Sequence, residues 1–332
     1  MSDAASPRLR LPARRTWLWV LGLLVCAFAL LAVHEFFIRS TPGQLLEQAT
    51  LESRYTDVTQ SLLQAGTLRD VLSAAPTVVA ILAGAIFLAI TLLRQRFIAA
   101  GIAAGMFLGA NITTQLLKNV WIHRGDAEVP MSDPNMQVWW WDIASFPSGH
   151  TTLAAAAAVA VFLISGPHQR PLIGLLTGML AGFSGAAIFL TGHFPSDIIA
   201  AYLVVALWGL LGGWLILRTG ERWNTVIIED DTSVAASAGL AWFLGIVFSA
   251  FTAVALLFAG GWDAVLSAAE DPSGWHWVAG TLLPVGPGFL LCAAGINLFD
   301  AEAGRRRHGQ PLYAPQHARH DVPSQFSHLY EV

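Results

Sequence analysis

Long apolar runs alternate with short polar segments along most of the chain. A helix needs about 20 apolar residues to cross the hydrocarbon core of a membrane, and in lipid only helices or closed barrels satisfy the backbone hydrogen bonds. The continuity of the runs favours helices. The pattern therefore predicts an all-α, polytopic membrane helical bundle with eight transmembrane helices, at residues 16–38, 75–93, 97–118, 150–166, 171–191, 196–217, 236–260 and 275–298.

These spans divide the chain into successive parts. From the N-terminus they are a tail at 1–15, a first span with an outer segment at 16–74, a helical core at 75–217, two additional spans at 218–299 and a tail at 300–332. The last tail is basic and contains prolines and histidines, so we expect it to be disordered. Within the outer segment, residues 39–74 contain amphipathic stretches typical of interfacial helices.

The composition supports a membrane protein. Hydrophobic residues make up 55% of the 332 residues and charged residues only 12%, whereas a soluble globular protein carries about 25% charged residues. The net charge of -4 gives no indication of a nucleic-acid partner. Cys26 and Cys292 both lie in apolar stretches, which predicts buried thiols and neither a disulfide nor a zinc framework.

Basic residues gather on one side of the predicted membrane. Cytoplasmic loops of membrane proteins carry an excess of Lys and Arg. With the N-terminus inside, 13 basic residues fall in inner segments and 5 in outer segments. This orientation predicts a multi-pass protein of the cell membrane with both termini in the cytoplasm. It also places Lys118, Arg124, His150 and His193 at the outer, extracytoplasmic ends of their spans.

Three short polar stretches, at 118–124, 146–152 and 192–197, contain groups suited to phosphoryl transfer. That reaction requires cations and oriented N–H groups around the phosphate, a nucleophile in line and a proton donor for the leaving oxygen.

Four residues are candidate ligands of the substrate phosphate. Lys118 and Arg124 provide positive charge. Ser148 and Gly149 precede an apolar helix, so we expect backbone N–H groups there to point at an anion, with support from the helix dipole. Glycine also allows a close approach of the backbone. An N-cap serine is the structural explanation of this stretch taken alone.

Two histidines and an aspartate are candidate catalytic groups. His150 lies where it can donate a proton. His193 and Asp197 are four residues apart, and a helix that begins near Pro195 places Asp197 in its first turn, within reach of His193. A carboxylate on one imidazole nitrogen fixes the tautomer and leaves the other nitrogen nucleophilic.

Together these residues resemble the signature of the type 2 phosphatidic acid phosphatase (PAP2) superfamily, in its membrane lipid phosphatase branch. That signature comprises a lysine with a following Arg-Pro, then Pro-Ser-Gly-His, then Ser-Arg, five residues, His, three residues and Asp. The chain has Pro-Ser-Gly-His at 147–150, the final His and Asp at His193 and Asp197, and the first part as Lys118 and Arg124. The resemblance covers roughly residues 75–217.

The resemblance implies a six-helix core, a phosphohistidine on His193, proton donation by His150, and neither a cofactor nor a metal in catalysis. The expected partners are a lipid phosphate substrate and membrane lipids, with no nucleic acid. The acidic residues of the loop between the third and fourth spans are expected to be solvated, without a role as metal ligands: Asp126, Asp133 and Asp142.

The chain departs from the signature at three points, one of which is that the gap between Lys118 and Arg124 is one residue shorter than in the common form. Gly125 follows Arg124 where the signature has proline, and the Ser-Arg positions hold Ala186 and Ala187. One phosphate ligand of the family is therefore absent, which should make the remaining cations more important. An arginine of the outer segment is an alternative ligand: Arg39, Arg54 or Arg69.

Three functions are consistent with these residues. The first is a metal-independent phosphoric monoester hydrolase that acts on a lipid phosphate monoester or diphosphate at the outer membrane face. The second is a lipid phosphotransferase, in which an alcohol replaces water as the acceptor. The third is a non-catalytic protein that binds or transports lipid phosphates, which the two alanines favour. The presence of both histidines favours an enzyme, because a binding protein has no need of both.

Overall fold

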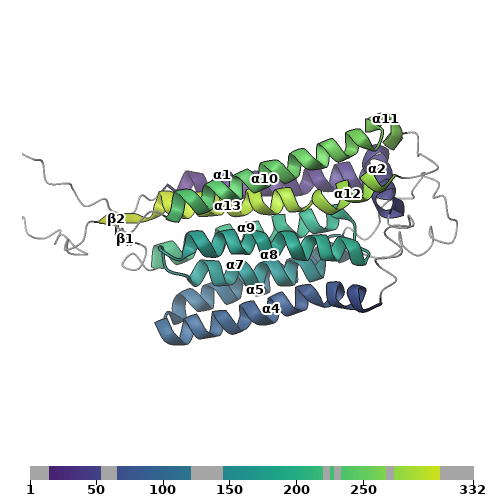
Figure 1. Cartoon of the computed structure of the whole chain (residues 1–332). Helices are drawn as coiled ribbons and strands as arrows, with labels where there is room; N and C mark the ends of the chain where they lie inside the picture. The colour runs from purple at the N-terminus through teal and green to yellow at the C-terminus, as the bar shows by residue number, and fades with distance from the viewer. Residues whose placement is uncertain are drawn as a thin grey trace, which may run out of the picture.

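The computed structural model describes residues 15–53, 66–120, 145–219, 225–227, 233–266 and 273–306. Its long helices run side by side as a bundle (Figure 1). They are α1 (Thr16–Val33), α4 (Gly66–Arg94), α5 (Phe97–Val120), α7 (Gly149–Ile164), α8 (Arg170–Thr191), α9 (Pro195–Thr219), α10 (Ser233–Phe258) and α13 (Val285–Glu302). The shorter elements are η1 (His34–Arg39), α2 (Thr41–Glu52), α11 (Gly261–Leu266), α12 (Gly274–Leu282), β1 (Thr225–Ile227) and β2 (Gly304–Arg306).

The helices match the predicted spans. Within the described residues, 7 helices are long and apolar enough to cross a membrane, and α7 is a shorter apolar helix. The prediction of a polytopic helical bundle is therefore confirmed. Two boundaries differ from it: α4 begins at Gly66, and the last predicted span is divided into α12 and α13. The break falls at Pro284, which lacks the backbone N–H that a continuous helix requires.

Long helices that follow one another along the chain alternate in direction, which brings distant segments together at each end of the bundle. At one end, hereafter the site end, Lys118 near the end of α5 lies beside Gly149 at the start of α7. At the opposite end, Arg94 of α4 donates a hydrogen bond to the side chain of Gln169, which precedes α8.

Helix α7 occupies the centre of the bundle, in contact with α4, α5, α8 and α9. Its buried middle, residues 154–158, consists of alanine, and small side chains let membrane helices approach closely. Helices α8 and α9 also approach closely because one of them has a small residue at the contact. Gly185 leaves room for the ring of Tyr202, whose hydroxyl donates to the carbonyl oxygen of Ala181 at 2.5 Å.

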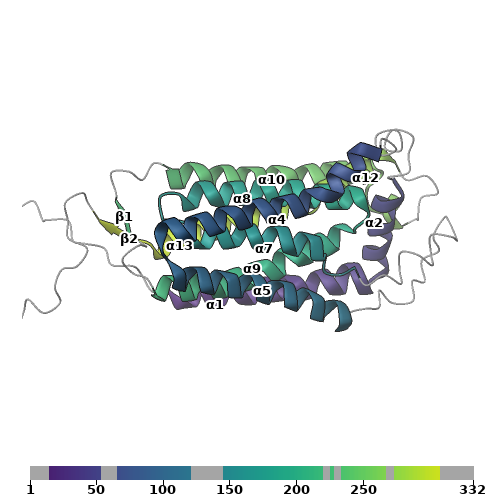
Figure 2. The same ribbon diagram turned by 90° about the horizontal axis from the view of Figure 1, so that it is seen from below.

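Helix α2 lies across the site end, crosswise to the long helices (Figure 2). The side chain of Ser40 caps it by accepting the N–H of Gly43 at 3.3 Å, and Pro42 lies in its first turn, as is common at helix starts. The helix packs on η1, α11 and α12. Glu47 in its middle is fully buried, so α2 is part of the protein interior in addition to covering the end of the bundle.

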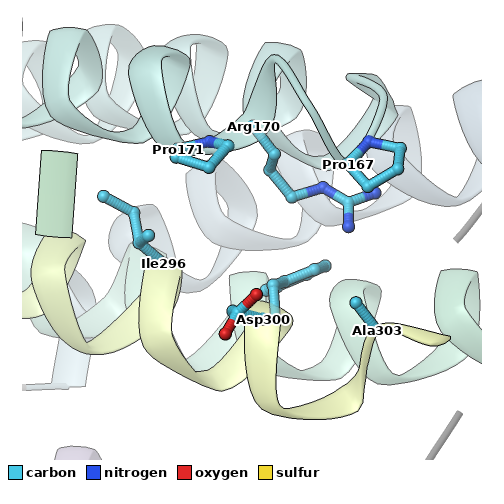
Figure 3. Close-up of a pocket in the computed structure, with 7 residues that line it drawn as sticks. Pro167, Arg170, Pro171, Ile296, Asp300 and Ala303 are labelled. Carbon is cyan, nitrogen blue, oxygen red and sulfur yellow. The ribbon is translucent and has the colours of Figure 1, made fainter. Parts of the chain in front are cut away.

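At the opposite end, Arg170 of α8 contacts α13. Its side chain extends from α8 toward the α13 residue Asp300 (Figure 3). The guanidinium carbon lies 4.7 Å from the centroid of the Phe299 ring, and Nη2 donates to the carbonyl oxygen of Ser165 at 3.0 Å. Arg170 is only 3% exposed, so these aromatic and backbone contacts replace water around its charge.

The described chain also begins and ends at this opposite end. The backbone N–H of Arg15 donates to the carboxylate of Glu302. Strands β1 and β2 pair in parallel nearby, with Thr225 opposite Gly304. This pair was not predicted, because a strand of 3 residues is too short to reveal an alternating pattern.

Candidate active site

The first turn of α7 is fixed by Ser148, its N-cap. The Ser148 side-chain oxygen accepts the backbone N–H of Thr151 at 3.4 Å and its hydroxyl at 3.0 Å, as N-cap serines do. Gly149 and His150 follow as the first helical residues, at positions where a helix leaves N–H groups without an intrahelical acceptor. Together with the helix dipole, these N–H groups form a position that favours an anion.

The first turn of α9 is fixed by Asp197. Gly192 ends α8 with a φ of 132°, a conformation that glycine adopts readily, and Pro195 starts α9. The Asp197 Oδ2 atom then accepts the backbone N–H of Phe194 at 3.3 Å, so the residue in the first turn reaches back to the cap. This local geometry brings His193 beside Asp197.

Buried hydrogen bonds join the two first turns to each other and to α5. The backbone N–H of Ser148 donates to the carbonyl oxygen of Asp197 at 2.9 Å. The hydroxyls of Thr152 in α7 and Thr114 in α5 lie 2.9 Å apart. All four residues are fully buried. These hydrogen bonds thus fix the positions of α5, α7 and α9 relative to one another at the site end.

His150 and His193 face each other at this junction. Their ring centroids lie 6.1 Å apart in an edge-to-face arrangement. Nδ1 of His193 is 3.6 Å from Oδ2 of Asp197, which is longer than a hydrogen bond, although catalytic pairs commonly tighten when substrate binds. The His193 side chain is 26% exposed and that of Asp197 is 0% exposed. The geometry therefore points one ring nitrogen of His193 at a buried carboxylate and leaves Nε2 for a ligand.

Lys118 brings a positive charge to the same place. A Cβ atom added to Gly149 would lie 3.6 Å from Nζ of Lys118 and 3.5 Å from Nε2 of Gln115. Lys118 is also within electrostatic range of His150 and Asp197. An ammonium, a side-chain amide and the N–H groups of a helix start thus surround a small space, and donors of this kind stabilise phosphate oxygens.

A comparison with protein families matches residues 99–223 to the model of the PAP2 superfamily. Because residues 99–223 are similar to this superfamily, they are hereafter called the PAP2 region. It contains nearly all of α5 and the whole of α7, α8 and α9, whereas α1, α2, α4 and the helices after α9 lie outside it. Comparisons with curated proteins and with solved structures gave no match. A PAP2 region within a polytopic membrane bundle supports a phosphatase-type enzyme that acts on lipids.

The PAP2 region gathers most of the residues that the sequence singled out. Those brought together are Lys118, Ser148, Gly149, His150, His193 and Asp197. Arg124 lies outside the described residues, as do Asp126, Asp133 and Asp142. The backbone N–H of Ser148, expected to face the phosphate, instead donates to the carbonyl oxygen of Asp197. The N–H groups that the first turn of α7 can offer to a ligand are therefore those of Gly149 and His150.

The two alanines at the PAP2 Ser-Arg positions are packed into the protein. Ala187 is 1% exposed, and Ala186 packs against an apolar cluster that includes Phe289 of α13. Among the suggested replacements, Arg39 is 66% exposed with its Nη1 atom 3.7 Å from the carboxylate of Glu35. Arg54 and the side chain of Arg69 fall outside the described part of the chain.

Glu47 of α2 belongs to this junction, although it lies outside the PAP2 region. Its Oε1 atom accepts the backbone N–H of Ser196 at 3.2 Å, in the same turn of α9 that carries Asp197. Glu47 could not be recognised from the sequence, because it is 149 residues from Ser196 and has no spacing relation to the motifs. Gln115 could have been identified as a site residue from the sequence, since it precedes Lys118 by about one helical turn and so lies on the same face of α5.

Proposed function

We propose that this protein is a membrane lipid phosphatase that hydrolyses a lipid phosphate monoester or diphosphate through a phosphohistidine at His193. The observation that carries the proposal is the meeting of His150 with His193 and Asp197 beside Lys118 at the start of α7. A site that only binds phosphate needs a cation and N–H groups. A histidine backed by a buried carboxylate and facing a second histidine adds a nucleophile and a proton donor.

The first chemical step transfers the phosphoryl group to the enzyme. Nε2 of His193 attacks phosphorus, and a P–N bond forms while the P–O bond to the lipid breaks. Asp197 accepts the hydrogen bond of Nδ1–H and stabilises the positive charge that develops on the ring. Protonated His150 gives its proton to the leaving oxygen. Lys118 and the N–H groups of α7 stabilise the phosphoryl oxygens throughout.

The second step releases inorganic phosphate. His150, now neutral, takes a proton from a water molecule, and the oxygen of that water attacks phosphorus. The P–N bond breaks, and its electron pair returns to His193. The enzyme is thereby restored with His150 protonated, ready for the next lipid.

We also propose that the site faces the outside of the cell. The opposite end of the described bundle carries Arg15, Arg94, Arg96, Arg170, Arg218, Arg305 and Arg306, and basic residues favour the cytoplasmic side. A substrate phosphate in the outer leaflet then lies at the level of the His193 ring.

One further observation favours a different function. Ala187 is buried where the PAP2 signature has an arginine, which is compatible with a protein that binds lipid phosphates without turnover. A phosphotransferase would use the same first step, with an alcohol in place of water in the second. We favour hydrolysis, because the two histidines and the buried carboxylate are all retained.

The test is a phosphate-release screen of the purified protein, with phosphatidate, phosphatidylglycerophosphate and polyprenyl phosphates and diphosphates as substrates. Release by the wild type, lost in His193→Ala, supports the phosphatase. A phosphorylated alcohol that forms only when an acceptor alcohol is added identifies a phosphotransferase. Tight binding of these lipids without any turnover identifies the non-catalytic protein.

A further inference from the structure

A cavity of about 500 Å³ lies inside the bundle, away from the active site. Its walls come from α7, α8 and α9 of the PAP2 region and from α1 and α13, which lie outside that region. Ligand pockets in proteins typically measure about 300–1,000 Å³. The cavity is therefore large enough for a ligand, and it sits where the PAP2 region meets its added helices.

The walls of the cavity select an apolar occupant. They are formed mostly by aliphatic, aromatic and glycine residues. Two hydroxyls of the wall have partners within the protein: that of Tyr202 donates to the carbonyl oxygen of Ala181, and that of Thr177 donates to the carbonyl oxygen of Ile173. The side chain of Asn297, which also lines the cavity, lies at an exposed position. A buried water needs two to four polar partners, so hydrocarbon suits this wall better than water.

The cavity and the active site lie on opposite faces of the same helices. Ala155 lines the cavity five residues after His150, and Tyr202 lines it five residues after Asp197. Five residues of α-helix correspond to a rotation of about 140° and a rise of about 7.5 Å. A molecule in the cavity is thus separated from the reacting groups by the bodies of α7 and α9.

The cavity opens between α1 and α13. Leu21 and Val25 of α1 line it, and they are 49% and 57% exposed. At the opposite end the two helices meet, with the ring centroids of Trp19 and Phe299 5.5 Å apart. Beyond that contact, the half-exposed lining residues show that the cavity reaches the lipid-facing surface of the bundle.

We infer that this cavity holds one hydrocarbon chain of a resident membrane phospholipid, whose headgroup lies at the opposite end of the bundle. The surrounding bilayer supplies such chains, and an empty cavity forfeits dispersion contacts on all its walls. Arginines at the opposite end suit an anionic headgroup: Arg218 lies there with its guanidinium carbon 4.3 Å from the ring centroid of Trp214. The lipid joins α1 and α13 to the PAP2 region and takes no part in hydrolysis.

Two matched glycine variants test this inference. Gly295 lines the cavity, and an added Cβ there meets nothing within 4 Å, so Gly295→Leu fills the cavity without a backbone clash. Gly239 of α10 has equally open surroundings but lies outside the cavity lining. Native mass spectrometry of protein purified in mild detergent measures the bound phospholipid.

We expect the wild type and Gly239→Leu to retain one phospholipid, and Gly295→Leu to retain at least about tenfold less, equivalent to about 1.4 kcal/mol in binding. Phosphate release should be unchanged in Gly295→Leu. Equal phospholipid in all three proteins, or none in the wild type, contradicts the inference. So does a wild type whose bound molecule is a lipid that it also hydrolyses, because the cavity would then hold substrate.

A second measurement applies even if Gly295→Leu fails to fold. A phospholipid with a photoreactive group in the middle of one chain is mixed with the wild type in bilayers and illuminated. The inference predicts crosslinks to the peptides of α1 and α13 that contain Val25 and Cys292, both of which line the cavity. Crosslinks confined to the outward faces of α4 and α10 contradict it.

Discussion

Lys118 is the only lysine of the chain, and its compact ammonium lies at the start of α7. Loss of one donor to a developing oxyanion costs about 2.7–4 kcal/mol, and with alanine at position 187 little other charge remains to compensate. We therefore predict that Lys118→Met lowers turnover at least about a hundredfold. The same loss is expected for Arg124→Met, with no rescue by Arg124→Lys, because the planar fork is absent.

Turnover, measured as steady-state phosphate release, tests this prediction. Asn119→Ala, at the neighbouring exposed position of α5, is the control and should leave turnover unchanged. A Lys118→Met protein with nearly wild-type turnover would mean that the phosphate pocket is built elsewhere.

Glu47 is expected to act as a positioning residue for the first turn of α9. Its carboxylate accepts the Ser196 N–H at a helix N-terminus, where negative charge is favoured. Glu47→Ala should lower kcat more than it changes KM, because Asp197 loses its position relative to His193. Glu47→Gln keeps an oxygen acceptor and should restore most of the activity. Both parameters come from the phosphate-release assay.

Gln44 provides the matched control for that prediction. It is a buried polar residue of the same helix, and its side chain donates to the carbonyl oxygen of Ile38 at 2.7 Å. Gln44→Ala should lower the melting temperature while kcat of the folded protein stays unchanged. If Gln44→Ala and Glu47→Ala lower kcat equally, Glu47 contributes only to stability.

The candidate catalytic residues could be identified from the sequence because their motifs are local. Ser148 caps the helix that carries His150, and Asp197 lies one turn after His193, so each relation is contained in a few consecutive residues. Glu47 could not be predicted in this way. Its contact with α9 depends on how α2 crosses the end of the bundle, and hydropathy carries no information on that packing.

At the scale of helices, Gly185 sets the approach of α8 to α9. An added Cβ there clashes with the hydroxyl of Tyr202, which would lose its hydrogen bond to Ala181. We predict that Gly185→Ala destabilises the protein by about 1–3 kcal/mol, the usual cost of overpacking a core. Gly105→Ala is the control, because nothing lies within 4 Å of an added Cβ at that position.

Thermal unfolding in detergent measures both variants. Gly105→Ala should leave the melting temperature unchanged or raise it, since alanine is the better helix former. A melting temperature of Gly185→Ala equal to that of the wild type would contradict the close packing of these two helices.

The spanning helices were predictable because a membrane imposes one length and one composition on each of them. The break at Pro284 was not predicted, since the apolar run continues across it. The burial of α2 was also missed. Its amphipathic pattern suggested an interfacial helix and carried no sign that η1, α11 and α12 pack on it.

At the scale of the whole molecule, the end of the bundle opposite the candidate site carries more arginines than the site end. We predict that, in a variant without Cys26 and Cys292, a cysteine at Asp133 reacts with an impermeant thiol reagent in intact cells, whereas a cysteine at Gln169 does not. Gln169 lies beside Arg94 at the arginine-rich end, which is expected to face the cytoplasm. The reverse labelling pattern would place the active site inside the cell.

The central claim is that His193 carries the phosphoryl group during turnover. Rapid-quench analysis with a lipid substrate labelled in its phosphate tests it directly, because it detects label on the protein and its release in one experiment. We predict label on His193 of the wild type within the first turnover, and no label with at least about a thousandfold slower release in His193→Ala. Wild-type rates of release in His193→Ala would contradict the account.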